Sequence, residues 1–80
     1  MTDRSRGYQP FVKPWNIEDR GESFHVTDAA GRTLAFIHYE DDPIRRDMMR
    51  RLSKYDARRM ADQIVRLPEL VAIERRMRNG

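Results

Sequence analysis

The chain has 80 residues, no cysteine, a net charge of +3 and 36% charged residues. A chain of this length forms one small domain, which buries only about 60–65% of the surface that it exposes when unfolded. The absence of cysteine excludes disulfides and thiolate metal sites. Among the supports that small domains commonly add, association with another copy or another protein is the one that remains, so self-association as a homodimer is expected.

Charge is distributed unevenly along the chain. Residues 1–42 carry five basic and eight acidic residues, whereas residues 43–80 carry eleven basic residues, ten of them arginine, against five acidic ones. A basic half attracts phosphates or an acidic protein surface, or it serves as a solvated helical face. No apolar run approaches the roughly 20 residues of a membrane span, and residues 1–10 contain no apolar signal segment. We expect a cytoplasmic protein with a flexible tail over residues 1–10 and a single domain over residues 11–80.

The N-terminal half of that domain predicts an antiparallel sheet. Pro14 cannot donate to a strand ladder, so a first, edge strand begins after it. The segment "DAAG" fits a three-residue hairpin loop in which Gly31 takes the left-handed conformation that only glycine enters without a Cβ penalty. Two or three strands are predicted, over about residues 15–18, 22–28 and 32–39.

The register of the hairpin follows from this loop. Phe24 is expected to lie opposite Phe36, and Val26 opposite Leu34, on the face that forms the core. The other face then holds the pairs Ser23–Ile37, His25–Ala35 and Thr27–Thr33.

This register has two consequences for function. It places His25 and His38 on opposite faces, so that they cannot bind one metal ion. It also leaves apolar side chains on the second face, which a third strand, a helix or another subunit should cover. The candidate interface residues are Trp15, Ile37 and Tyr39, together with the exposed end of the last helix.

The C-terminal half predicts helices. Asp42 and Pro43 have the form of an N-cap followed by proline at the first helical position, and Ser53 is a second N-cap with Asp56 near the positive end of the helix dipole. An apolar stripe at helical spacing (Ala57, Met60, Ala61, Ile64 and Leu67) is expected to pack on the sheet. The predicted helices cover residues 43–51, 54–67 and 68–78.

Together these features predict an α+β fold, a two- or three-stranded antiparallel sheet packed on one face by C-terminal helices. The entry "WN", the hairpin "DAAGRTLAFIHYEDDP" and the helix "ARRMADQIVRLPEL" also resemble a family of short uncharacterised bacterial proteins that is classed as a domain of unknown function. The resemblance covers about residues 15–71. It implies this fold and a bacterial cytoplasmic setting, and it supplies no functional residue.

The sequence is compatible with different classes of function. A small non-enzymatic protein-interaction module is favoured, either self-associating or docking on an acidic protein. The alternative is nucleic-acid binding, because phosphate contacts need clustered cations. Aspartates interrupt these arginines at ion-pair spacing, for example Asp62 four residues after Arg58. An enzyme is not expected, since no catalytic, metal-binding or cofactor-binding set is visible. The candidate nucleic-acid contacts are Arg45, Arg46, Arg50, Arg51, Arg58 and Arg59.

Overall fold

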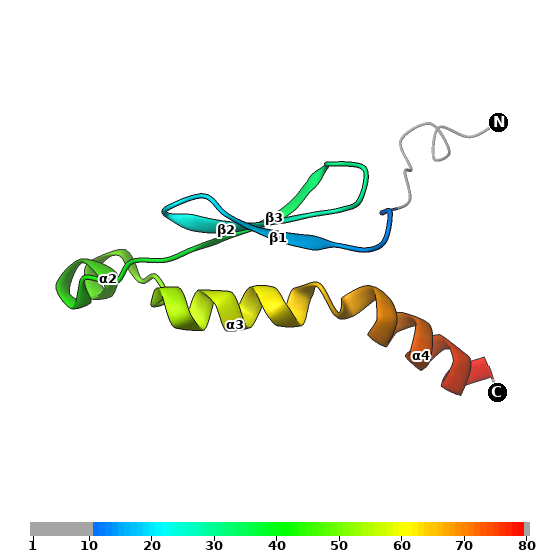
Figure 1. Cartoon of the computed structure of the whole chain (residues 1–80). Coiled ribbons are helices and arrows are strands. Elements are labelled where there is room, and N and C mark those ends of the chain that lie inside the picture. Colours follow the sequence, from blue (N-terminus) through cyan, green and yellow to red (C-terminus); the bar gives the residue numbers. More distant parts are fainter. Residues whose placement is uncertain (1–10, 80) are drawn as a thin grey trace, which may run out of the picture.

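The computed structural model describes residues 11–79; the predicted tail over residues 1–10 lies outside the described residues, as does residue 80. A three-stranded antiparallel sheet of order β1-β2-β3 comes first, and helices follow it (Figure 1). The α+β fold predicted from the sequence is therefore confirmed. The elements are β1 (Asn16–Asp19), β2 (Ser23–Thr27), β3 (Thr33–His38), α2 (Pro43–Met49), α3 (Lys54–Ile64) and α4 (Leu67–Asn79).

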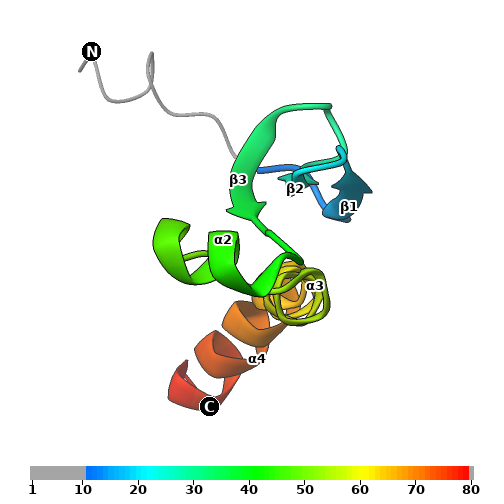
Figure 2. The same ribbon diagram turned by 90° about the vertical axis from the view of Figure 1, so that its left-hand side faces the viewer.

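Helix α3 covers one face of the sheet, and within residues 11–79 no element lies over the opposite face (Figures 1 and 2). Helix α4 continues past the end of the sheet and turns away from it (Figure 1). The core is a single small cluster between the sheet and α3, bordered by Trp15, Ile17, Ala35, Ile64 and Val65. Its buried members are Phe24, Val26, Ile37, Tyr39, Ala57 and Ala61.

The hairpin loop is confirmed, but the predicted register beyond it is wrong. Gly31 has φ of +90°, and Thr27 pairs with Thr33 as expected. A β-bulge between Val26 and Thr27 then shifts β3 by one residue, so that Phe24 pairs with Ile37. Because side chains alternate between faces, one inserted residue exchanges the two faces of a strand.

The other predicted pairs change with this shift. Val26 lies opposite Ala35 and not Leu34, and His25 lies opposite Phe36. The expected Ser23–Ile37 and His25–Ala35 pairs do not form either, because Ser23 pairs with His38. Phe24 is buried in the core, whereas Phe36 is 58% exposed on the uncovered face.

The helix caps form as predicted. The Asp42 carboxylate accepts hydrogen bonds from the amides of Ile44 and Arg45, and the Ser53 hydroxyl accepts one from the amide of Asp56. Helix α3 ends at Ile64, three residues earlier than predicted, and α4 begins at Leu67.

Small residues decide how closely α3 approaches the sheet. Ala57 and Ala61 are fully buried there, whereas Met60, predicted to belong to the same stripe, is 45% exposed. The covered face of α3 is therefore narrower than the apolar stripe in the sequence suggests.

Asp28 connects the segment before β1 to the β2–β3 hairpin loop through hydrogen bonds. Its carboxylate is buried and accepts hydrogen bonds from the amides of Val12 (3.1 Å), Ala30 (3.1 Å) and Arg32 (2.9 Å). The Arg32 guanidinium pairs with the same carboxylate at 2.9 Å, and the amide of Ala29 donates to the Val12 carbonyl. The Val12 amide, followed by the amide and side chain of Arg32, lowers the pKa of Asp28 to about 2 despite its burial. This cluster holds residues 11–15 in place.

Candidate functional site

Two of the three predicted interface residues lie inside the protein. Ile37 and Tyr39 are each only 8% exposed and belong to the core, and Trp15 is partly buried against it. The expected position of Ile37 and Tyr39 on the second sheet face is wrong, because the bulge moves them to the face that α3 covers. These two side chains therefore present little surface to a partner.

The polar end of Tyr39 has a structural role. Its hydroxyl donates to Asp19 Oδ1 at 2.7 Å, and the other oxygen of Asp19 lies 3.3 Å from Lys54 Nζ. The hydrogen bond to Asp19, with burial, raises the pKa of Tyr39 to about 12. The amide of Gly21 and the Tyr39 hydroxyl lower the pKa of Asp19. A phenol held this firmly protonated suits the joining of β1, β3 and α3 better than acid–base catalysis.

The bulge also moves His38 to the uncovered sheet face, where His25 lies as predicted, so the prediction that the two histidines lie on opposite faces is wrong. Phe36 lies between them. Its ring is edge-on to that of His25, with 4.4 Å between the ring centroids, and nearly parallel to that of His38, with 6.4 Å between the centroids. Within residues 11–79, no group of three or more histidine, aspartate or glutamate side chains is placed to hold a metal ion.

Helix α4 exposes most of its apolar surface. It contains no buried residue, although a soluble helix normally turns its apolar side chains toward a core. Five large apolar side chains are between 37% and 78% exposed: Leu67, Leu70, Val71, Ile73 and Met77.

These side chains lie on two sides of α4, because successive residues are spaced at 3.6 per turn. Leu70, Ile73 and Met77 follow the spacing i, i+3, i+7 and form one line, which we call the α4 stripe. The opposite side carries Pro68, Ala72 and Arg75, which face the segment over residues 11–15 across a surface hollow.

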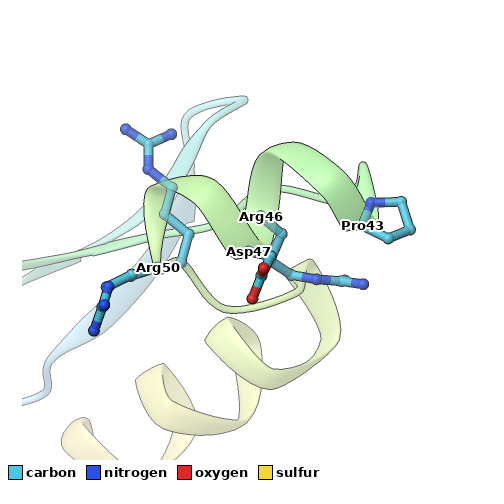
Figure 3. A pocket seen from close by; sticks show the side chains of 5 residues that line it. Pro43, Arg46, Asp47 and Arg50 are labelled. Atoms are coloured by element: carbon cyan, nitrogen blue, oxygen red, sulfur yellow. The ribbon is translucent and has the colours of Figure 1, made fainter.

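A second hollow, of about 640 Å³, lies on α2 and is mainly cationic. Figure 3 shows Arg46 and Arg50 leaving the helix in different directions, with Asp47 near Arg46. The cations are spread over an open surface and do not converge on one point. The hollow is lined by Pro43, Arg46, Asp47, Arg50 and Arg51.

The six predicted nucleic-acid contacts divide into two groups. Arg58 pairs with Asp62 at 3.0 Å, as its spacing predicts, and Arg59 pairs with Asp56 at 3.0 Å. Arg45 lies 3.7 Å from Glu40. In the described part of the chain no carboxylate lies within ion-pair distance of the remaining three, Arg46, Arg50 and Arg51. Three of the six thus line one open hollow on α2.

Sequence reasoning identified the exposed end of α4 but missed the hollow beside it. The apolar spacing of α4 is visible in the sequence, whereas residues 11–15 are placed beside α4 by contacts with distant residues, such as the hydrogen bond from the Val12 amide to Asp28. The local signal was the aromatic pair Phe11 and Trp15, whose rings meet edge-on at 6.1 Å.

Among residues 11–79, no helix combines the length and the apolar content needed to cross a membrane. No protein-family model matches the chain, and neither the curated proteins nor the solved structures contain a significant match.

Proposed function

We propose that this protein is a small non-enzymatic interaction module that self-associates through the α4 stripe. The observation that carries the proposal is the absence of any buried residue on a 13-residue helix that holds five large apolar side chains. Exposed apolar surface gathered on one element is typical of an interaction site. Association would also stabilise a small domain whose core is thin and has no disulfides.

The charges beside the stripe favour a second copy, packed antiparallel. Glu69 and Arg76 are seven residues apart and therefore flank the stripe on the same side. In an antiparallel pair of α4 helices, Glu69 of each copy faces Arg76 of the other, and the two helix dipoles oppose each other. A parallel pair instead brings Glu69 toward Glu74 of the other copy. The charge pattern thus supports a two-fold symmetric contact centred near Ile73.

The contact is small, and the association is accordingly weak. A helix of 13 residues is only about 20 Å long, so the pair buries less area than a standard permanent interface. We expect a monomer–dimer equilibrium whose position depends on protein concentration.

Met77→Glu is expected to weaken self-association at least about tenfold, because it places a charge in the apolar contact. Met48→Glu on α2 is a matched control, since Met48 and Met77 are 77% and 78% exposed. Sedimentation equilibrium at two concentrations measures the mass against the 9.6 kDa of one chain. A 9.6 kDa species throughout, or equal effects of the two variants, would contradict the proposal.

The orientation has its own test. Glu69→Arg is expected to weaken the dimer by placing like charges together, and adding Arg76→Glu is expected to restore it. If the double variant associates no better than the single one, antiparallel pairing is wrong even where self-association itself holds.

A second candidate function is binding of a polyanion such as nucleic acid at α2. It is supported by Arg46, Arg50 and Arg51, which have no ion-pair partner among the described residues and are spread along an open surface. Three phosphate contacts would give a log–log dependence of affinity on salt with a slope of about −3.

Arg46→Gln with Arg51→Gln is expected to reduce binding of labelled duplex DNA or RNA at low salt, as measured by fluorescence anisotropy. Arg58→Gln with Arg59→Gln removes the same charge from arginines that are already paired, and should have a smaller effect. Wild-type protein that leaves the anisotropy unchanged at low salt would dismiss this function.

A further inference from the structure

The hollow beside α4 is formed by two segments that are far apart in the sequence. Phe11, Lys13 and Trp15 form one wall, and the other comes from the first three turns of α4; we call the hollow the tryptophan groove. Its volume of about 470 Å³ is within the roughly 300–1,000 Å³ typical of sites for small molecules. The α4 wall consists of Leu67, Pro68, Val71, Ala72 and Arg75.

The walls are mostly apolar and partly pre-formed. Phe11 remains 60% exposed although its ring contacts Trp15 edge-on and has the Arg32 guanidinium 6.0 Å from its centre. Leu67 and Val71 are also open to solvent on the facing wall. Apolar side chains that line a concave surface favour a ligand with an apolar body, because binding removes them from water.

Two cations lie on opposite walls of the groove. Lys13 and Arg75 are both exposed, and in the described part of the chain neither has a carboxylate within ion-pair distance. For Arg75 the helix itself offers no ion-pair partner, because no acidic residue lies three or four positions from it. Arg78, by contrast, pairs with Glu74. The groove therefore complements an anion.

Trp15 adds an unsatisfied donor. Its indole nitrogen Nε1 is buried and has no hydrogen-bond acceptor among the residues that the structure describes. Buried donors in native proteins are nearly always paired, and an orphan calls for an explanation. The indole ring lines the groove, so its N–H group reports on a ligand that enters there.

The geometry points to the tryptophan groove as a binding site for an amphipathic monocarboxylate, an apolar chain or ring that carries one carboxylate. The carboxylate is held by Lys13 and Arg75, and the apolar body lies against Trp15 and Val71. The volume favours a small molecule over a folded partner. The site is on the side of α4 opposite the stripe, so it does not depend on self-association.

Octanoate is a suitable probe, and Trp15, as the only tryptophan, provides a single indole N–H signal in a ¹⁵N-correlated NMR spectrum. We expect octanoate to shift this signal saturably. We expect 1-octanol, which lacks the charge, to bind about tenfold more weakly. Octylammonium, with the opposite charge, should leave the signal unchanged.

Charge reversal on the groove tests the same assignment. Arg75→Glu is expected to weaken octanoate binding about tenfold, and Lys13→Glu similarly. Arg20→Glu is the control, because it makes the same charge change at an exposed arginine that belongs to neither the groove nor the α4 stripe. The dispersion of the remaining amide signals verifies that each variant folds, and Arg75→Gln offers a milder change if Arg75→Glu does not.

Three results would overturn the proposal. One is an indole signal that octanoate does not move. Another is equal binding of octanoate and 1-octanol in both the wild type and Arg75→Glu, which would show an apolar surface without an anion site. The third is a shift produced by an acidic helical peptide but not by octanoate, which would make the groove a protein-docking surface. Repeating the titration with Met77→Glu separates these outcomes from a change in self-association.

Discussion

Phe24→Ala is expected to lower the free energy of unfolding by about 3–5 kcal/mol, whereas Phe36→Ala should lower it by less than about 1 kcal/mol. The two substitutions remove the same atoms from residues on adjacent strands. Phe24 is 3% exposed and its ring lies 5.1 Å from that of Tyr39, so its removal leaves a cavity. Phe36 is 58% exposed on the uncovered face, so its removal leaves no buried cavity, although its contacts with two histidine rings are lost.

Urea denaturation followed by circular dichroism measures both values. A loss of about 3–5 kcal/mol is a large part of the stability of a small domain. If Phe24→Ala unfolds outright, Phe24→Leu supplies a measurable, smaller loss. Equal losses for Phe24→Ala and Phe36→Ala would show that both rings are buried, and thus that β3 has the register without the bulge.

Asp28→Ala is expected to lower the midpoint of thermal unfolding by at least about 10 °C, because it removes the acceptor of three amides and the ion pair between Asp28 and Arg32. Asp28→Asn keeps one carbonyl oxygen and should be less damaging. Asp62→Ala, which removes an exposed carboxylate paired with Arg58, is the control and should change the midpoint little.

The Asp28 carboxylate should also make the stability of the protein depend on pH. Its pKa is about 2 in the folded protein against an ordinary value of 3.8. A lowered folded-state pKa stabilises the protein fully above pH 3.8, and this stabilisation is lost as the pH falls through about 2. The thermal midpoint of the wild type should therefore drop between about pH 4 and pH 2, and the drop should be smaller in Asp28→Asn.

A different result would assign Asp28 another role. Asp28→Ala and Asp62→Ala could have the same thermal midpoint, or the midpoint could fall equally with acid in the wild type and Asp28→Asn. Either result would show that residues 11–15 are held by contacts other than this cluster. The tryptophan groove would then lose the anchor that positions its first wall.

Local chemistry made several elements of this fold predictable. The hairpin loop follows from Gly31, whose φ is positive, and the starts of two helices follow from the side-chain oxygens of Asp42 and Ser53. Each depends on residues within four positions of one another, so the sequence contains the whole interaction. The i, i+4 pair of Arg58 and Asp62 is local in the same way.

The faces of the sheet were not predictable by the same reasoning. The loop alone is compatible with Phe24 opposite Phe36, and only packing against α3 distinguishes that register from the bulged one. The bulged register buries Ile37 and Tyr39 and leaves Phe36 outside. It thereby moved two predicted interface residues into the core and both histidines onto one face.

The α+β class, the hairpin loop, the helix caps and the apolar spacing of α4 could be predicted from the sequence, since these depend on neighbours along the chain. The strand register, the three arginines without a carboxylate partner within residues 11–79, and the tryptophan groove became visible only in the folded chain. The physical reason is that each of these depends on contacts between distant segments, such as the amide of Val12 and the carboxylate of Asp28. A bulge or a buried carboxylate changes such contacts without altering any local propensity.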